Sequence, residues 1–412
     1  MQFCDKMCPE SEMIFREKNG LLHHLEMIDL DRFESYRSSQ SFKKDRNIAR
    51  DRECTKKTLT FTNDSIAVKQ YVRSSAGRQM NETKLIRSTK TLRKTIDYLL
   101  GDCWDRKALN LRYKVNQIEI FSLYYDFVFD RLRAIRQDLC ILQSHDPDCF
   151  YIIEKCIEFY LNFHFIFHQK LRIDEQIDFE KTFAKSRSNF DSHINQTHLQ
   201  DCLSLLIDYY DYFQNDCWSL NRHRFESIYI LYNLRENLQH LAFERIRKLR
   251  SKLDTNRMLN ERMRTIFDYL RCYLIGNHFR CLRIILRSDQ DRLLRILFLS
   301  FNAHSHHLEL IRLINIAYRS AIGNKLSLRE LIEWFCPQRI DRKESQIYSE
   351  RLFRNHGFKM MQSDRDDLET SSIIVDKSLP IDLRYKWTEM DQILLNHCYR
   401  ELILDKYRAL IQ

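Results

Sequence analysis

The chain has 412 residues and a net charge of +10, with 67 Lys and Arg against 57 Asp and Glu. It contains only six Gly and four Pro, and no two Gly lie within twenty positions of one another. Because tight turns and phosphate-binding loops depend on these residues, the composition argues against a large β-sandwich or barrel and excludes P-loop, dinucleotide-binding and kinase-type enzymes.

The N-terminal region, 1–66, is predicted to hold a short helix within 1–36 and then a linker, 37–66, that is rich in charge and poor in apolar residues. The positive charge is concentrated here and just beyond. Residues 37–94 carry sixteen basic and five acidic residues, so the rest of the chain is close to neutral. Such a segment either contacts nucleic acid or an acidic partner, or is a solvated arm, and both interpretations stay open.

A helical array is predicted over 67–322. Its clearest helix is 113–143, where apolar residues recur at alternating spacings of three and four: Ile118, Phe121, Tyr125, Val128, Leu132, Ile135 and Leu139. The same apolar spacing recurs in the segments 150–171, 196–216, 224–250, 258–287, 290–300 and 304–321. Each is too short to bury its apolar stripe alone, and no fixed period relates them. The fold class predicted is all-α, an irregular α-solenoid.

The pattern changes after Gly323. Two short helices, 326–335 and 341–356, precede two strand candidates, 358–361 and 371–375. This order is typical of a winged helix with a small β-wing, predicted over 323–382. A last helix, about 387–411, is predicted within the C-terminal region, 383–412.

The thirteen Cys are scattered and form no C-x-x-C motif, which predicts reduced thiols in the cytosol or nucleus. The N-terminus lacks the apolar core of a signal peptide. The longest uncharged apolar stretch, 159–169, is about half a membrane span. We therefore expect a soluble protein that is not secreted and does not contact a membrane.

Four sequence blocks follow one another in a recognisable order: 7–10 (MCPE) with Arg16 and 22–26, then 68–77 (VKQYVRSSAG), then 126–139 (DFVFDRLRAIRQDL), then 276–279 (GNHF) with 327–331. Together they resemble the Sac-three/GANP/Thp-three family, helical scaffolds related to PCI-domain proteins. The length resembles that of the short stand-alone members.

The resemblance implies a non-catalytic scaffold without cofactor or small-molecule substrate. Such scaffolds act in nuclear mRNA export and processing, and short members are linked to centrosome duplication and spindle assembly. The implied partners are a PCI-domain protein and its small acidic companion. The implied location is the nucleus, the centrosome or both, together with the cytoplasm.

The alternative is a direct single-stranded RNA-binding module that uses the basic segment 37–94. In its second half, an aromatic residue lies among positive charges that could reach phosphates. The candidate contacts to nucleic acid or a partner are Lys69, Tyr71, Arg73, Arg78, Arg87 and Lys90.

The block 126–139 combines acidic and basic residues. Arg131, Arg133 and Arg136 could form a basic strip that faces RNA or a partner. Because Asp126, Asp130 and Asp138 are interleaved with them, we favour pairing with charges of neighbouring helices, which would fix the stacking of the helices.

In the predicted winged helix, the candidate contacts are Arg342, Lys343, Arg351 and Arg354. Residues 325–377 hold ten basic and ten acidic residues, whereas a winged helix that reads DNA is usually basic. Pairing with a partner's winged helix is therefore favoured over direct binding.

Signals for a metal or a catalytic centre are weak. Cys4 and Cys8 with His23 and His24 lack a second ligand pair at zinc spacing. His304 and His307 share a helix face and suggest a metal-dependent enzyme, but a polar face explains them more simply. We therefore expect no metal, no cofactor and no catalytic residue.

Overall fold

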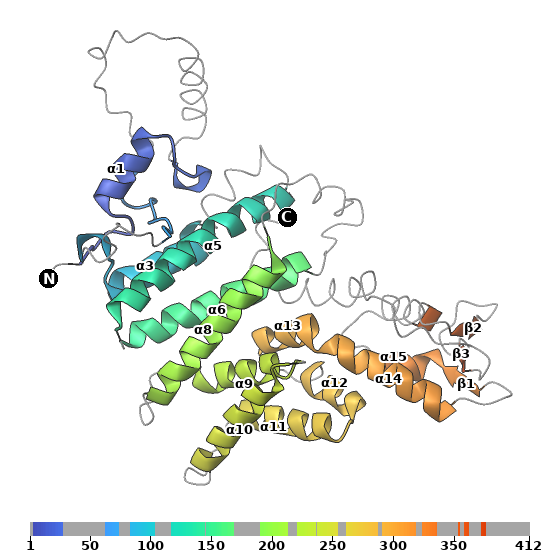
Figure 1. Ribbon diagram of the computed structural model, residues 1–412. Helices are drawn as coiled ribbons and strands as arrows, with labels where there is room; N and C mark the ends of the chain where they lie inside the picture. The colour runs from blue at the N-terminus through green and yellow to red at the C-terminus, as the bar shows by residue number, and fades with distance from the viewer. Residues whose placement is uncertain are drawn as a thin grey trace, which may run out of the picture. The chain divides into compact units, whose positions relative to one another are not determined.

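The computed structural model describes residues 3–27, 62–73, 83–103, 117–144, 146–168, 190–212, 221–235, 237–253, 261–286, 291–318, 324–335, 353–354, 358–361 and 372–375. These residues are predominantly helical, which confirms the all-α class (Figure 1). They divide into two compact units, Met1–Cys156 with Phe183–Phe190, and Ile157–Thr182 with Asp191–Gln412. The predicted domain boundaries lie elsewhere and stay predictions.

The first unit is organised around a long helix, α5 (Gln117–Leu142). Its predicted apolar stripe is confirmed where side chains are described, since Tyr125, Val128, Leu132, Ile135 and Leu139 are all buried. Helix α3 (Thr89–Leu100) packs against α5. The Ser88 hydroxyl caps α3 by accepting a hydrogen bond from the amide of Thr91.

The rest of the unit consists of short elements. Helix α1 (Glu10–Lys18) and the 3₁₀ turn η1 (His24–Glu26) belong to the N-terminal segment, and a second 3₁₀ turn, η2 (Thr83–Leu85), precedes α3. The sequence predicted helices from residue 67 onwards, but 66–73 contain none. The backbone amides of Val68, Gln70 and Tyr71 donate to carboxylates of other elements, so these hydrogen bonds take the place of those of a helix.

The second unit contains most of the predicted array. It begins within α6 (Pro147–His168) and continues through α8 (Ser192–Tyr212), α9 (Arg222–Asn233), α10 (Gln239–Leu253), α11 (Glu261–Leu274), α12 (His278–Leu286), α13 (Arg292–Phe301) and α14 (Ala303–Tyr318). Helix α9 contacts α8, α10, α11 and α13, and every residue from Phe225 to Asn233 is buried. It is the centre of this unit's core.

Two predicted helical segments are each divided in the structure. Segment 224–250 breaks between α9 and α10, where Asn237 has a φ of +70°. Segment 258–287 breaks between α11 and α12, where Gly276 has a φ of +70°. Asn and Gly enter this left-handed region more readily than other residues. Because the apolar stripe continues across each break, the periodicity of the sequence does not reveal where the helix ends.

A small sheet follows α14. Strand β1 (Asn324–Ser327) leads directly into α15 (Leu328–Phe335), and strands β2 (Lys359–Met361) and β3 (Ser372–Val375) come later. The order is β1-β3-β2 and both pairings are antiparallel, with Ile373 opposite Leu326 and Met360. Strands β2 and β3 were predicted, and β1 was missed.

Apolar side chains fill the space beneath this sheet. Ile373, Leu331, Phe335 and Phe353 are almost completely buried. Of the predicted helix 341–356, only 353–354 are described, and the predicted helix 387–411 lies outside the described residues. The solenoid and the winged helix stay predictions.

None of the helices in the described residues is long and apolar enough to span a membrane.

Candidate functional site

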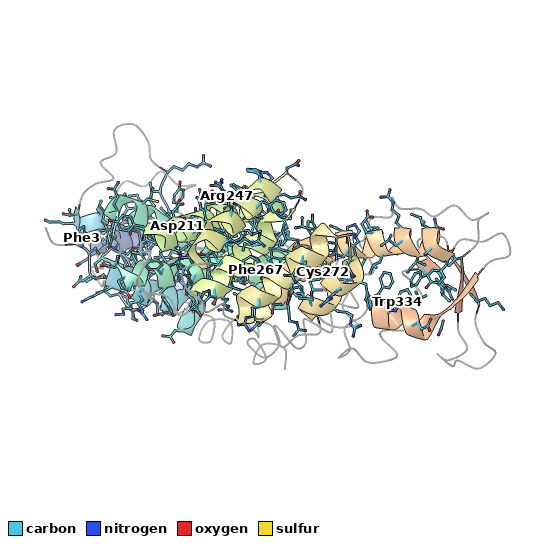
Figure 2. All side chains as sticks on the ribbon, turned by 90° about the horizontal axis from the view of Figure 1, so that it is seen from below. Phe3, Asp211, Arg247, Phe267, Cys272 and Trp334 are labelled. Carbon is cyan, nitrogen blue, oxygen red and sulfur yellow. The ribbon has the colours of Figure 1, made fainter. Side chains whose placement is uncertain are left out.

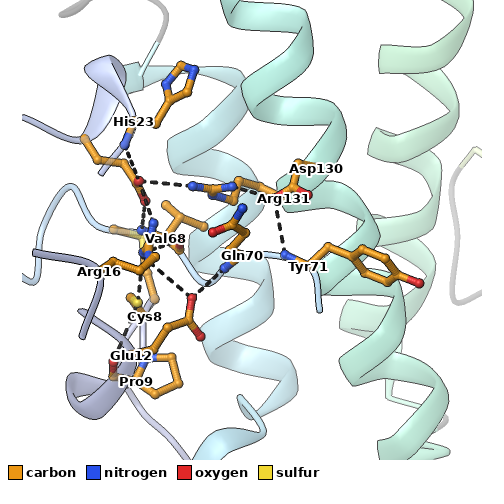
Figure 3. A network of polar contacts seen from close by, with 12 residues as sticks. Cys8, Pro9, Glu12, Arg16, His23, Val68, Gln70, Tyr71, Asp130 and Arg131 are labelled. Atoms are coloured by element: carbon orange, nitrogen blue, oxygen red, sulfur yellow. Dashed lines mark hydrogen bonds and ion pairs between the residues drawn. The ribbon is translucent and has the colours of Figure 1, made fainter. Parts of the chain in front are cut away.

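A buried carboxylate, Glu26, is the centre of a polar network in the first unit. Figure 3 shows this network, with the partners Arg16, Val68 and Arg131 labelled. Its Oε2 accepts hydrogen bonds from Arg16 Nη1 at 2.7 Å and Arg131 Nη2 at 3.0 Å, and its Oε1 accepts from the amide of Val68 at 2.9 Å. Burial acts to raise the pKa of Glu26, but Arg131, Arg16 and the Val68 amide outweigh it and lower this pKa. The carboxylate is therefore held ionised between two guanidinium groups.

Arg16 extends the network to two further segments. Its Nη2 donates to the Val68 carbonyl at 2.9 Å and contacts the Cys8 sulfur at 3.2 Å, and its Nε pairs with Glu12 at 3.4 Å. Glu12 in turn accepts from the amide of Gln70 at 2.8 Å. Burial raises the pKa of the Cys8 thiol to about 12, so this thiol stays protonated.

A second buried carboxylate, Asp138, holds the segment before α3. Its oxygens accept from Arg87 Nε and Lys69 Nζ, each at 2.7 Å. Lys69 Nζ also donates to the Leu85 carbonyl at 2.6 Å, and Arg87 Nη1 to the Met7 carbonyl at 3.3 Å. Both Arg87 and Asp138 are fully buried, so this pair ties three segments to α5.

One face of α5 lies along the extended segment 68–73. Asp130 accepts a hydrogen bond from the amide of Tyr71 at 3.2 Å, and the Arg133 guanidinium lies 3.9 Å from the centre of the Tyr71 ring. One turn later, Gln137 Nε2 donates to the Val72 carbonyl at 3.0 Å. These helix positions are three and four residues apart and therefore share a face. The network therefore positions backbone segments of the first unit.

The model of one protein family, the SAC3/GANP family, matches residues 7–349, a stretch that contains all of this network. The chain belongs to the SAC3/GANP family. SAC3 family protein B of Arabidopsis thaliana is 28% identical over 208 residues, which cover 50% of this chain and 9% of that protein. The chain therefore corresponds to a small part of that relative.

The SAC3/GANP family is in general one of non-catalytic scaffolds, and membership supports a scaffold role at the level of the family. The network is consistent with such a role, because it fixes the N-terminal segment and the segments 66–73 and 85–88 to one helix. Removal of one partner of a buried ion pair leaves an uncompensated charge in the interior, so pairs of this kind are costly to break.

The predicted contact residues of this SAC3/GANP chain fall into three groups. Lys69, Arg87 and Arg131 pair with carboxylates in the interior, and Tyr71 and Arg133 stack on each other. Arg73, Lys90 and Arg354 are exposed, and Arg136 and Asp126 are half-buried. Arg78, Arg342, Lys343 and Arg351 lie outside the described residues.

The charges of block 126–139 therefore form no continuous exposed strip, because Arg131 is buried and Arg133 covers Tyr71. Pairing was the favoured interpretation, and Asp130 and Asp138 do bind neighbouring segments. The partners differ from those expected. Asp130 and Asp138 bind extended segments, and Arg131 binds Glu26 of a 3₁₀ turn, where neighbouring helices were predicted.

Sequence reasoning missed the roles of Glu26 and Arg16. Both lie in the first family block, but neither was given a function. What distinguishes them is that they are charged and buried, and burial is a property of the folded chain that the sequence does not reveal. Arg131, the partner of Glu26, is 105 positions away from it, beyond the range of any periodicity.

Ion pairs also fix neighbouring helices of the second unit. Arg245 of α10 is buried and pairs with Glu226 of α9 and, at 2.7 Å, with Asp211 of α8 (Asp211 is labelled in Figure 2). Arg224 of α9 pairs with Glu158 of α6 at 3.1 Å and with Asp291, the residue that caps α13, at 2.6 Å.

Among the described residues, no group of three or more His, Cys, Asp or Glu side chains is placed so that it could hold a metal ion. Cys8 contacts Arg16, and His23 stacks on Phe127. His307 is buried beside Phe335, while the neighbouring His306 bonds to the Tyr269 hydroxyl at 2.7 Å and to His278 at 2.9 Å. These histidines pack within the core of the second unit.

The two buried histidines predict an acid-sensitive second unit. Burial lowers the pKa of His306 and of His307 to about 3, against an ordinary value of 6.5. The unfolded chain therefore takes up protons first, and stability is lost as the pH falls below about 6.5. At about pH 5 each histidine should cost about 2 kcal/mol of unfolding free energy. Urea denaturation between pH 7.5 and 5.5, above the titration of carboxylates, measures this slope.

The His306→Gln variant should show a shallower dependence on pH than the parent chain. The matched control is His240→Gln, because His240 is exposed on α10 and should leave the slope unchanged. A pH-independent midpoint over this window would contradict the prediction.

Proposed function

We propose that this SAC3/GANP chain is a scaffold that pairs with a PCI-type partner and its small acidic companion. In this proposal it acts either in nuclear mRNA export and processing or in centrosome duplication and spindle assembly. The observation that carries the proposal is the family match over 7–349, which reaches from the N-terminal network into the module that begins with β1 and α15.

The proposed architecture is an irregular α-solenoid followed by a winged helix. In the second unit, consecutive helices contact one another in the pairs α8–α9, α9–α10, α11–α12, α12–α13 and α13–α14, as stacked helices do. After α14, a short strand, a helix and two antiparallel strands follow in the described residues, which supports the winged-helix part of the proposal.

Pairing is proposed through the C-terminal module because its charges balance. A module without net charge gains little binding free energy from contact with a phosphate backbone. A protein partner of complementary shape can bind it without such a charge. In the described part of the module, Lys325 and Arg354 are exposed and could contact such a partner.

Affinity purification of the tagged chain, followed by identification of the co-purifying subunits, tests the pairing. We expect a PCI-domain protein and a small acidic protein, and at least a tenfold lower recovery of both with Lys325→Glu and Arg354→Glu combined. The control carries Arg247→Glu and Arg250→Glu, which are exposed on α10. Absence of a PCI subunit, or equal recovery with both variants, would reject this proposal.

Imaging of the tagged chain through the cell cycle separates the two settings. A signal confined to the nucleus would remove the centrosomal role, and a signal confined to the spindle poles would remove the role in export.

Direct binding of single-stranded RNA is the second candidate. Exposed basic side chains favour it, since Arg73, Lys84, Lys90 and Lys94 form no ion pair within the described residues. Deletion of 37–94 would be a poor test, because it would also remove Lys69 and Arg87, which hold Asp138. The four exposed residues should be changed to Glu together.

The measurement is fluorescence anisotropy with a labelled oligouridine at several salt concentrations. If these residues contact phosphates, affinity should fall and the slope of log K against log salt should become shallower by up to about 3. Charge reversal of Arg247, Arg250, Arg264 and Arg312 in the second unit is the control. Equal binding by both variants would exclude this surface.

A further inference from the structure

The turn between α11 and α12 leaves two large aliphatic side chains in water. The turn closes through hydrogen bonds from the amide of Asn277 to the Cys272 carbonyl at 2.8 Å and from the amide of Gly276 to the Tyr273 carbonyl at 3.1 Å. Leu274 is 66% exposed and Ile275 is 71% exposed. Within the described residues these are among the most exposed apolar side chains.

A hollow of about 450 Å³ lies beside this turn, lined by Asn277, Phe279, Arg280, Arg283 and Ile284 of the α12 region. The Phe279 ring lies 6.1 Å from that of Trp334 on α15, edge to face (Trp334 and, near the end of α11, Cys272 are labelled in Figure 2). The Arg283 guanidinium lies 5.2 Å from the centre of the Phe279 ring. The hollow therefore has an aromatic wall that carries a positive charge.

The two arginines of the hollow are available to a ligand. Arg280 and Arg283 are both exposed, and neither forms an ion pair with a carboxylate in the part of the chain that the structure describes. Residues 261–286 contain five Arg against Glu261 and Asp268, a net charge of +3. A ligand with negative charge would therefore be attracted to this corner.

The exposed aliphatic side chains of Leu274 and Ile275 favour an acidic peptide over a nucleic acid as the ligand. Leu274 and Ile275 gain from burial only against an apolar side chain, and interfaces with nucleic acid are more polar than this. Stacking of a base on Phe279 is disfavoured, because Arg283 covers one side of the ring and Trp334 packs near it. A peptide can supply both the apolar side chain and the carboxylates.

We propose that the corner formed by Leu274–Arg283 docks a short acidic segment of a partner protein. Carboxylates of that segment pair with Arg280 and Arg283, and one of its apolar side chains covers Leu274 and Ile275. The proposal assigns a role to the family block that begins at Gly276. It does not depend on pairing through the C-terminal module, because it rests on other residues.

The test uses the full chain and an array of short synthetic peptides. Each peptide carries several Asp or Glu around one or two Leu, Ile or Phe, and each has a counterpart in which Asn and Gln replace the acids. We expect the chain to retain a subset of the acidic peptides and none of their amide counterparts. Failure of every acidic peptide to exceed its counterpart would overturn the proposal.

Variants then locate the binding by fluorescence anisotropy with the best retained peptide. Arg280→Glu with Arg283→Glu should weaken binding at least tenfold, and Leu274→Ser with Ile275→Ser about fivefold. The control, Arg247→Glu with Arg250→Glu, carries the same change of charge and should stay within twofold. All of these side chains are exposed, and unchanged circular dichroism verifies the fold.

Two results would contradict the proposal at this stage. Equal peptide binding by the Arg280→Glu, Arg283→Glu variant and the control would place the peptide elsewhere. Loss of oligouridine binding in that variant, with peptide binding unchanged, would make the corner a nucleic-acid surface.

Discussion

Replacement of Glu26 by Gln is expected to lower the free energy of unfolding by about 3–5 kcal/mol. The side chain is fully buried between Arg16 and Arg131, which are themselves buried. The substitution keeps the shape but removes the buried countercharge that the two guanidinium groups share, and leaves them only the more exposed Glu12 and Asp130. Its new amide group would also place N–H donors against N–H donors. The midpoint of urea denaturation, followed by circular dichroism, measures the effect.

The matched control is Glu10→Gln. Glu10 also pairs with a basic residue, Lys6, but its side chain is 64% exposed, and exposed pairs contribute about 0–1 kcal/mol. We expect a large loss of unfolding free energy in the Glu26 variant only. Equal, small losses in both variants would show that Glu26 does not stabilise the first unit.

Replacement of Asp138 by Asn should have an effect of similar size, about 3–5 kcal/mol, for a related reason. It removes the countercharge of Arg87, which is fully buried, and of Lys69, whose side chain is 13% exposed. Besides this loss of unfolding free energy, the substitution should loosen the segment 85–88 locally. Residues 85–88 are held by Asp138 and by a parallel bridge between Cys4 and Arg87. Hydrogen exchange at the amides of Arg87 and Ser88 should accelerate.

Asp64→Asn is the control for this variant, because Asp64 is half exposed and pairs only with Lys6 among the described residues. Its exchange rates at 85–88 should match those of the parent chain. Protection at Arg87 that survives the Asp138 substitution would mean that the segment is held by other contacts.

The helices were predictable because burial imposes a period on the sequence. The stripe of α5 contains an apolar residue at every turn, and the structure buries the described members of it. The breaks at Asn237 and Gly276 were less visible, since a single left-handed residue interrupts a helix without changing its composition. Strand β1 was missed because four residues, one of them a Lys, are too short for an alternation to stand out.

The network was predictable only in part. Interleaved acids and bases in block 126–139 indicated pairing, and Asp130 and Asp138 do pair. The identity of the partners was not accessible, because Glu26, Lys69 and Arg87 lie in segments without a periodic pattern. Arg87 and Lys69 looked like surface charges in the basic segment. Only their contact with a buried carboxylate, which is a property of the tertiary structure, distinguishes them from exposed neighbours such as Lys90.

The long separation between Glu26 and Arg131 has a consequence for how the chain is made. A ribosome that adds about 5–20 residues per second needs several seconds to advance from the first residue to the second. During this time Arg16 and Glu26 have left the exit tunnel, but the helix that will enclose them has not been synthesised. The N-terminal segment therefore docks late, and its charged side chains lose their hydration only after α5 has emerged from the ribosome.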